Sequence, residues 1–496
     1  MCCIYLCLTH TVLPMHLVYF SRSGWEGWGL PSVPLVRQGM PVLIDDDLLF
    51  EDDHGPRPTV AVNLWLQNLP LDGAPAQKTW VTYAQSMKSW LEYLDEVGVH
   101  AFAERDALRA ALSSFAEYRL SGPLTARWEV STWNQQIKTV ARFYQWAVDE
   151  AHCTAVPFTY AYVRRVTEAG VVLVQRNQAT LATPKPHVTI RYLEDDFLQL
   201  FLWALAGLGP GGEPDIFRGR HLGRNAAMAK LTVSSGPRAQ EFTHLLTFEL
   251  PPLPSRPTEL PVPFPLSAQI TKGKKPRETW IDADPLAEVW QYLELDRAAI
   301  AAGRTYRPPS ALGEPLLISE ADWEGGRVNG HRESWRRLTL GERRRLVTPD
   351  GAPAVLALQS DGTPFIDWRT LFRRTSLRIR RDFEPRFPLV SPHMLRHTFA
   401  MRTLQKLVMG YYARAAALVA DTHEDAALAL YLTKHDPMLV LRDLLGHSSV
   451  TTTEIYVARL DVQRIYREFY SKARLKDGSA SAEADAEFDD GDDAEW

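Results

Sequence analysis

Two short runs of residues toward the C-terminal end of the chain have side chains that suit work on a phosphate. In the first run, His393 and Arg396 lie at positions i and i+3 of a helix that Ser391 and Pro392 are suited to start. A guanidinium group can bind two phosphate oxygens at once, and the positive end of a helix dipole favours the same anion. This run therefore predicts a phosphate site with an imidazole beside it.

The second run combines a glycine, a histidine and a tyrosine. Residues 440–445 predict an apolar helix that Gly446 ends in a left-handed cap, followed by His447 and a Ser/Thr-rich helix start carrying Tyr456. A tyrosine hydroxyl has an unperturbed pKa of about 10, so it attacks phosphorus at neutral pH only when neighbouring groups take its proton or stabilise the phenolate. Each motif alone is more often a helix cap or a core residue, but their joint order and spacing favour a catalytic site.

These motifs resemble those of the tyrosine recombinases, also called phage integrases. That family has an early arginine, a lysine in a β-hairpin, a His-x-x-Arg motif, a Gly-His pair and a tyrosine nine residues after that histidine. Residues 234–241 are similar to the segment with the early arginine, which places Arg238 in its position and makes Glu241 its acidic companion. The upstream part of the pattern is therefore present.

Residues 270–281 resemble the lysine hairpin of the family. The segment predicts two short strands around a glycine-bearing turn. Lys272 is our choice for the catalytic lysine, and Lys274 is the nearest rival. The alternative for this segment is a basic hairpin that only contacts the DNA backbone.

The resemblance implies phosphoryl transfer to a tyrosine, with no metal and no cofactor. Tyr456 would attack the scissile phosphate, forming a 3′-phosphotyrosyl bond and leaving a free 5′-hydroxyl. Arg238 and Arg396 would bind the non-bridging oxygens, as metal ions do in other phosphoryl-transfer enzymes. Because the covalent intermediate keeps the energy of the phosphodiester bond, the 5′-hydroxyl of a second strand can reverse the step without ATP.

Three further residues would handle protons and the phosphate, again as the resemblance implies. Lys272 would protonate the departing 5′-oxygen. His393 would assist proton transfer at the tyrosine, and His447 would donate a hydrogen bond to the phosphate. The predicted catalytic set therefore has six members: Arg238, Lys272, His393, Arg396, His447 and Tyr456.

Motifs of competing chemistries are missing from the sequence. It contains no Gly-x-x-x-x-Gly-Lys-Ser/Thr loop, no Cys-x-x-Cys and no His-Glu-x-x-His. Acidic clusters at residues 45–47 and 51–53 raise a metal-dependent nuclease as a weak alternative. Without partners at a set spacing, these carboxylates are better interpreted as solvated surface.

The chain is long enough for two domains with appendages. Its 496 residues are 45% hydrophobic, and the motifs occupy only residues 238–456. Apolar stripes that include Trp80 and Ile137 predict helices before them, in the position of the family's core-binding domain. The fold class is mainly α with a small antiparallel β-sheet in the catalytic domain, and the two domains would clamp DNA. The predicted parts are a poorly ordered N-terminal extension (1–57), a SAM-like helical core-binding domain (58–165), a linker (166–190), a catalytic domain (191–475) with an insertion at about 303–365, and an acidic disordered tail (476–496).

The charge distribution is compatible with double-stranded DNA as the partner. The formal net charge of −5 argues against a nucleic-acid binder, but residues 477–496 hold nine acids and neither lysine nor arginine. Without them, 55 basic residues stand against 51 acidic ones. The residues predicted to contact DNA are Lys138, Arg142, Lys274, Lys275, Arg277, Arg373 and Arg374.

Cysteine use indicates a reducing compartment, because three of the four cysteines lie within the first seven residues and Cys153 stands alone. The first twenty residues lack the basic start and cleavage site of a signal peptide, so we expect an extension, with Met40 as an alternative start. We expect a bacterial cytoplasmic protein, associated with the nucleoid when bound to DNA and not with a membrane. On DNA it would form a dimer to tetramer, with an accessory DNA-bending protein as a further candidate partner.

Two classes of function remain open. The first is a site-specific recombinase that integrates, excises or transposes a mobile element, or a relative that uses the same pocket as a hairpin telomere resolvase or a type IB topoisomerase-like enzyme. The second is a DNA-binding regulator whose catalytic site has decayed. The intact set of six predicted catalytic residues favours the first class.

Overall fold

The computed structural model of the chain contains two compact units, residues 1–187 and 188–496. The boundary falls within the segment 166–190 that the sequence predicts to be a linker. The structure describes residues 15–456 except 22–28, 30–31, 33–34, 53–54, 75, 168–169, 183–190, 216–218, 257, 259, 422–435, 448–449 and 455.

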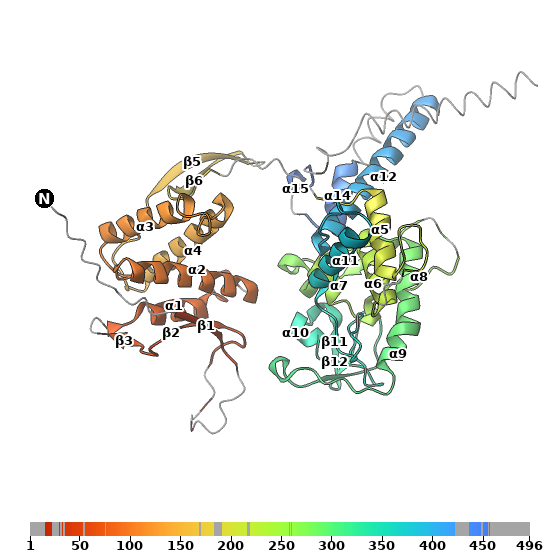
Figure 1. Ribbon diagram of the computed structural model, residues 1–496, viewed down its shortest axis with the longest axis horizontal. Helices are drawn as coiled ribbons and strands as arrows, with labels where there is room; N and C mark the ends of the chain where they lie inside the picture. Colours follow the sequence, from red (N-terminus) through yellow and green to blue (C-terminus); the bar gives the residue numbers. More distant parts are fainter. Residues whose placement is uncertain are drawn as a thin grey trace, which may run out of the picture. The chain divides into compact units, whose positions relative to one another are not determined.

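The N-terminal unit is built on a group of helices around an aromatic core (Figure 1). The stripe predicted from Trp80 is confirmed, because Trp80, Met87 and Trp90 are buried. Inside the core, the Trp90 indole N–H lies 3.1 Å from the Tyr144 hydroxyl, which donates to the Ala101 carbonyl at 2.9 Å. The polar atoms of these two buried aromatic side chains are thus paired. The helices are α1 (Pro58–Asn68), α2 (Gln77–Glu96), α3 (Arg105–Leu120) and α4 (Val130–Asp149).

Two strands that precede these helices belong to the same core. β1 (Met15–Tyr19) and β2 (Pro41–Asp45) pair antiparallel, and Met15, Met40 and Leu43 are buried against the helices. The unit therefore begins before residue 58, within the segment that the sequence assigned to an extension. Periodicity missed β1 because its partner strand lies more than twenty residues away in the sequence. The short strands β3 (Glu51–Asp52) and β4 (Gly55–Pro56) follow.

The acidic cluster around residue 45 makes structural contacts. Arg57 Nη2 lies 2.8 Å from Asp47 Oδ2, and Thr59 donates a 2.8 Å hydrogen bond to Asp45 Oδ2. These carboxylates hold the start of α1 against the end of β2. In the described part of the chain, no group of three or more His, Cys, Asp or Glu side chains is placed to hold a metal ion.

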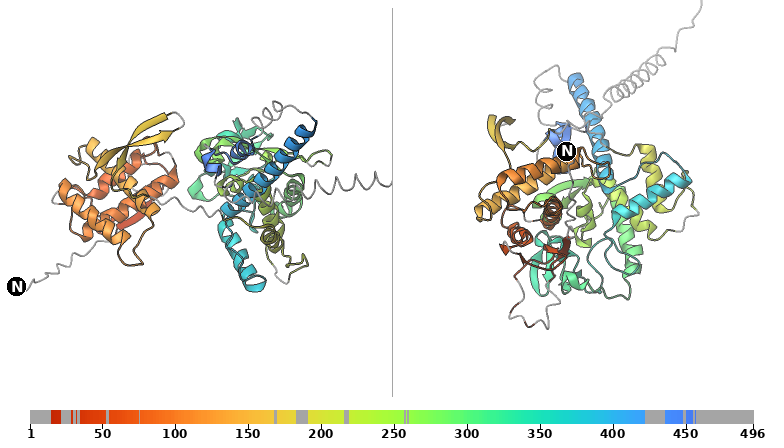
Figure 2. Two further views of the ribbon diagram at one scale, coloured as in Figure 1. Left: turned by 90° about the horizontal axis from the view of Figure 1, so that it is seen from above. Right: turned by 60° about the vertical axis from the view of Figure 1, so that its left-hand side comes forward.

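A long hairpin ends the N-terminal unit. β5 (Tyr160–Thr167) and β6 (Gly170–Asn177) pair antiparallel, with Val163 opposite Val174. The hairpin projects from the helices in all three views, where it is drawn in gold (Figures 1 and 2). Its start was assigned to the helical domain and its remainder to the linker, so regular structure continues where the sequence predicted a connection.

The C-terminal unit is organised around one buried helix, α6. This helix packs against α5, α8 and α12. Met228 and Leu231 on it are fully buried. Among the described residues, no helix combines the length and apolar character needed to cross a membrane. The helices are α5 (Asp195–Ala206), α6 (Leu222–Ser235), α7 (Ala239–Thr243), α8 (Ala283–Tyr292), α9 (Ala298–Ala301), α10 (Leu340–Arg343), α11 (Trp368–Asp382), α12 (Pro392–Asp421), α14 (Pro437–Leu445) and α15 (Thr451–Glu454).

Two small sheets complete the C-terminal unit, which makes the fold mainly α with small sheets, as predicted. β7 (Val262–Leu266) pairs antiparallel with β8 (Arg277–Ile281). The segment predicted as an insertion carries a second sheet, in the order β11-β10-β9-β12, in which only β12 runs parallel to its neighbour. A small core with Trp335 at its centre supports this sheet. Its strands are β9 (Leu316–Ser319), β10 (Gly325–Val328), β11 (His331–Ser334) and β12 (Leu346–Val347).

The lysine hairpin differs from the sequence prediction in its first strand. The sequence placed that strand at residue 270, whereas the structure pairs β8 with β7, and residues 268–274 form short 3-10 turns. Pro263 and Pro265 made β7 resemble a loop. Both prolines are tolerated because β7 has a free edge, where a missing N–H costs no hydrogen bond.

The insertion sheet is anchored by a buried ion pair. Arg343 is fully buried and binds both carboxylate oxygens of Glu249, at 2.6 and 2.9 Å. Its Nη1 also donates to the His244 carbonyl at 3.1 Å. Arg343 is thus a structural residue.

We predict that Arg343→Leu lowers the free energy of unfolding of the C-terminal unit by about 3–5 kcal/mol, because it leaves the Glu249 carboxylate buried without a counter-charge. Urea denaturation followed by circular dichroism measures the change. Arg337→Leu is the control, since that side chain is 79% exposed, and it should change the free energy by less than about 0.5 kcal/mol. Equal effects of the two substitutions would refute a structural role for the pair.

Candidate active site

The predicted early arginine lies at a sharp corner between α6 and α7. Gly236 ends α6 with a φ of 63°, and a Cβ there would approach the Phe399 ring to 2.2 Å. Only glycine fits this position, because it tolerates both the positive φ and the close approach. Arg238 then caps α7: its backbone N–H donates to Glu241 Oε2 at 2.7 Å, and its Nη1 donates to Glu241 Oε1 at 3.0 Å.

A single buried carboxylate, that of Glu241, balances several arginines. Besides Arg238, it binds Nη2 of Arg277 at 2.6 Å, and its own side chain is fully buried. Burial by itself would raise the pKa of Glu241, but Arg277, the Arg238 N–H and Arg396 together hold that pKa below its usual value. Glu241 is therefore ionised at neutral pH and keeps the arginines in place.

Arg277 connects the lysine hairpin to the end of α14. It is the first residue of β8, its side chain is 7% exposed, and Nη1 donates to the Leu444 carbonyl. A Cβ at Gly446, which has a φ of 61°, would lie 2.4 Å from Arg277 Cδ. Arg277 was predicted to contact DNA. The structure instead buries it, because Glu241 compensates its charge inside the unit.

Arg396 lies between two helix ends. Its Nη1 donates to the Gly236 carbonyl at 2.5 Å, and its Nη2 donates to the Leu445 carbonyl. The residue is 2% exposed. Burial, with Arg277 and Arg238 nearby, lowers its pKa to about 9, so the guanidinium keeps its charge at neutral pH. Ser391 and Pro392 start this helix, α12, as the sequence predicts.

The predicted nucleophile reaches the same region from the other side of α14. Tyr456 is 1% exposed, and its hydroxyl lies 2.8 Å from Nδ1 of His397. It lies in a turn just after α15 rather than on the predicted helix. Burial raises the pKa of Tyr456 to about 12, although Arg396 and Arg238 act in the opposite direction. The hydroxyl is therefore protonated at neutral pH.

Three histidine rings surround the tyrosine and its neighbours. The His393 and His397 rings lie 4.2 Å apart between centroids. The His447 ring is nearly parallel to that of Tyr456, at 6.5 Å, and its Nδ1 is 3.0 Å from Thr453 Oγ1. Burial, followed by neighbouring ionisable groups, lowers the pKa of both His397 and His447 to about 4. Both rings are neutral at pH 7 and can accept a proton.

The first unit contains a segment that matches a known family model. Residues 62–151 match the family model described as phage integrase, N-terminal SAM-like domain. This segment is therefore similar to the N-terminal domain of phage integrases. The match lies within the predicted helical domain and covers α2, α3 and α4 in full.

Solved structures of two recombinases were also found. The Tn1549 transposon integrase in complex with a circular intermediate DNA is 12% identical and covers 80% of this chain and 94% of its own, with a TM-score of 0.44. The XerH site-specific recombinase bound to palindromic difH substrate, in a post-cleavage complex, is 14% identical and covers 82% of this chain and 83% of its own, with a TM-score of 0.42. No curated protein matches the chain.

Five of the six predicted catalytic residues gather at one place, and Lys272 lies apart on the hairpin turn. Lys272 and Lys274 are both exposed between β7 and β8. Within the part of the chain that the structure describes, neither makes a hydrogen bond or ion pair to the cluster. Because β8 begins with Arg277, the turn continues directly into the site.

The residues predicted to contact DNA differ in their surroundings. Arg142 is exposed, but it donates to the Tyr83 hydroxyl at 3.3 Å and to the Asp72 carbonyl. In the arginine-rich window before His393, Arg378 is buried and binds Asp215 Oδ2 at 2.5 Å. The predicted DNA contacts that the structure leaves exposed besides Arg142 are Lys138, Lys274, Lys275, Arg373 and Arg374.

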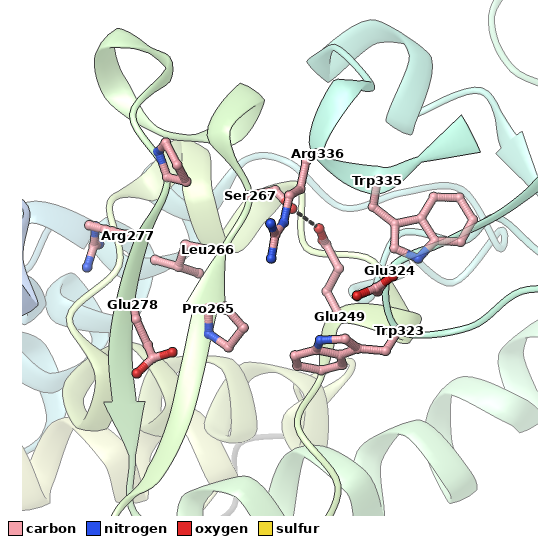
Figure 3. A pocket seen from close by; sticks show the side chains of 11 residues that line it. Glu249, Pro265, Leu266, Ser267, Arg277, Glu278, Trp323, Glu324, Trp335 and Arg336 are labelled. Carbon is pink, nitrogen blue, oxygen red and sulfur yellow. Dashed lines mark hydrogen bonds between the residues drawn. The ribbon is translucent and has the colours of Figure 1, made fainter. Parts of the chain in front are cut away.

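A cavity of about 290 Å³ lies on the other flank of the hairpin (Figure 3). It is formed between β7, β8 and the insertion, and Ser267 donates a hydrogen bond to Glu249 at its wall. Arg277 is the one site residue that lines it. The histidines and Tyr456 are not part of this cavity, so its position does not mark the catalytic centre.

Sequence reasoning overlooked two features of the cluster. These are the presence of His397 and the structural role of Arg277. Signals for both were present. His397 lies four positions after His393, so the two share a helix face. Arg277 has the same strand parity as Thr279 and Ile281, which are buried, and this parity places it on the inner face of β8.

We predict that the C-terminal unit loses stability as the pH falls from about 6.5 to about 4. The unfolded chain binds protons on His397 and His447 at a higher pH than the folded chain, so the stability from these residues is complete above the unfolded pKa and is lost on acidification. Urea unfolding at several pH values measures the loss. His397→Asn should reduce it, whereas His331→Asn, at an exposed position, should not. Identical pH dependence in the wild type and His397→Asn would contradict this assignment.

Proposed function

We propose that this protein is a site-specific DNA recombinase that cleaves and rejoins DNA strands through a 3′-phosphotyrosyl intermediate on Tyr456. The observation that carries the proposal is the hydrogen bond between the Tyr456 hydroxyl and His397, next to two arginines. A tyrosine that was only part of the core would not require cations and neutral imidazoles around its hydroxyl. The physiological outcome would be integration, excision or transposition of a mobile element.

The phosphate would bind to Arg238 and Arg396. Two N–H groups of Arg396 are held by backbone carbonyls, which fixes the plane of the guanidinium and leaves its other N–H groups for phosphate oxygens. Arg238 is 26% exposed and uses Nη1 on Glu241. Fixed donors stabilise charge that develops in the transition state without having to reorganise. His447 would donate a further hydrogen bond to the phosphate.

The tyrosine proton would pass to His397 rather than to His393. The pKa values of about 12 for Tyr456 and about 4 for His397 make a complete transfer before attack strongly unfavourable. The proton is therefore transferred as the Tyr456 oxygen bonds to phosphorus, when the hydroxyl becomes acidic. His393, which is exposed and in ring contact with His397, would carry the proton to solvent.

The departing 5′-oxygen would take its proton from Lys272. As the bond between phosphorus and the 5′-oxygen breaks, the electron pair stays on that oxygen, and the ammonium group neutralises it by donating a proton. The exposed turn would bring the lysine onto the DNA when the duplex is bound. Rejoining is the reverse: a 5′-hydroxyl attacks the phosphotyrosine, and Tyr456 leaves and recovers its proton.

The proposed partner is double-stranded DNA, bound by both units. Basic side chains on α4 and α11, including Lys138 and Arg373, would contact phosphates and make binding weaken with salt. Recombination joins strands of two duplexes, so the active form on DNA would be an oligomer of two to four copies, with an accessory DNA-bending protein where the site geometry requires it.

We predict that Tyr456→Phe abolishes covalent capture of DNA and leaves binding within about threefold of the wild type, because only the attacking oxygen is lost. Bound sequences are first selected from a pool of random duplexes with the Tyr456→Phe protein. The selected duplex is then made with a nick beside each phosphate in turn, so that the cleaved fragment diffuses away and the adduct accumulates. Denaturing electrophoresis measures the adduct.

The matched control for this experiment is Tyr118→Phe on α3. This tyrosine is 39% exposed, so its hydroxyl can be removed without opening a cavity. The control should form the adduct at the wild-type rate. Covalent capture by Tyr456→Phe, or none by the wild type on any nicked form of a tightly bound duplex, would overturn the proposal.

We also predict that Lys272→Ala slows cleavage by about 10²–10⁴-fold, and that a substrate with sulfur in place of the bridging 5′-oxygen restores most of the rate. A thiolate leaves without protonation, so the sulfur substrate removes the need for a general acid. Lys274→Ala is the control and should slow cleavage of the ordinary substrate much less. Rescue of Lys274→Ala and not of Lys272→Ala would reassign the role to Lys274.

A further inference from the structure

The outer part of the β5–β6 hairpin exposes apolar side chains on both faces. The exposed fractions are 65% for Val171, 48% for Val172, 66% for Leu173 and 38% for Val174. Because successive residues of a strand point to opposite faces, neither face of β6 is covered. The hairpin is anchored at its base, where Tyr160 packs on the helical core.

A hairpin of this kind is an unfavourable surface for an isolated protein. Two strands by themselves are marginally stable in water, and an unpaired edge attracts another strand. Proteins usually protect such an edge with charge, proline or a bulge. From Gly170 to Val174, β6 has neither a charge nor a proline, and its register with β5 continues without a bulge.

The two edges of the hairpin differ in charge. Opposite Leu173 in this apolar run of β6, β5 carries the exposed Arg164. If two copies met through β5, the arginine of each would face a like charge, which destabilises a strand pair. If they met through β6, the facing residues of the run 171–174 would be valine and leucine. The β6 edge is therefore the self-complementary one.

We propose that β6 pairs with β6 of a second copy of this chain, antiparallel and about a twofold axis, giving a four-stranded sheet. The backbone groups of the free edge make hydrogen bonds across the axis, and Val171, Val172 and Leu173 gain apolar neighbours from the other copy. The contact is small compared with the roughly 800 Å² per partner of a stable interface, so the pairing is weak and strengthens when both copies are held on one DNA.

The symmetry limits the register. A twofold axis perpendicular to the sheet leaves the side chains of each face on the same side of the combined sheet. Two residues that lie opposite each other across the axis are therefore both odd-numbered or both even-numbered. One residue must then lie opposite its own copy. Within the apolar run, the candidates are Val171, Val172 and Leu173. Opposed residues of antiparallel strands have Cα atoms about 4.5–5.5 Å apart, which is within the span of a disulfide.

Single cysteines test this arrangement directly. In full-length protein whose four native cysteines are serine, Val171→Cys, Val172→Cys and Leu173→Cys are oxidised in turn and examined by non-reducing electrophoresis. We expect one of the three to form a disulfide-linked dimer at least tenfold faster than the others. Tyr162→Cys on β5 is the control: that residue is 73% exposed, so its thiol is more accessible but lies on the other strand, and the dimer should not form.

Val172→Lys tests the same contact without cysteine chemistry. In each of the three registers it adds a positive charge at the twofold axis or one residue from it, where the charges of the two copies repel and disturb the apolar contact. Sedimentation should therefore show weaker self-association than for the wild type, whereas Tyr162→Lys should leave self-association unchanged. Cross-linking at Tyr162 as fast as on β6, or at none of the three β6 positions, would overturn the proposal. The proposal would also be overturned if Val172→Lys lost DNA affinity while its self-association stayed unchanged, because the hairpin would then be a DNA-contact element.

Covalent capture of nicked DNA through Tyr456 stays intact in every case, so this test is independent of the proposed catalytic function.

Discussion

The site depends on one buried positive charge, the guanidinium of Arg396, held between two helix ends. The carbonyls of Gly236 and Leu445 accept from it, so it joins the corner before α7 to the end of α14. An arginine with 2% exposure would be costly without compensation, and Glu241 supplies much of it. The hydrogen bond from Arg396 to the Leu445 carbonyl fixes the end of α14. The position of Tyr456, which follows α14 in the chain, depends on the same contact.

Around the Arg396 guanidinium, the arginines carry positive charge and the histidines are neutral. Three arginines share one ionised carboxylate, so positive charge is in excess where a phosphate would bind. Burial is the main cause that lowers the pKa of His397 and His447, and Arg396 acts in the same direction, so both rings are neutral at pH 7 and able to accept protons. In the DNA-free protein, burial dominates at Tyr456 and keeps the phenol protonated. A hydroxyl that stays unionised until phosphorus approaches is protected from reactions with other partners.

Much of this arrangement could be predicted from spacing, because its determinants are local. Gly446 ends α14, Pro392 starts α12, and Gly236 ends α6, each by a backbone preference that the sequence shows directly. Contacts between distant segments could not be predicted in this way. The pairing of β1 with β2, the proline-containing strand β7 and the ion pair of Arg277 with Glu241 depend on partners far along the chain.

The contact between Arg277 and Gly446 has a consequence for how this site can change during evolution. The aliphatic part of Arg277 occupies the space that a side chain at position 446 would need. A larger residue at 446 can be accepted only together with a shorter one at 277, and a shorter residue at 277 gives up the ion pair with Glu241. The two positions are therefore expected to covary among homologues, even though 169 positions separate them in the sequence.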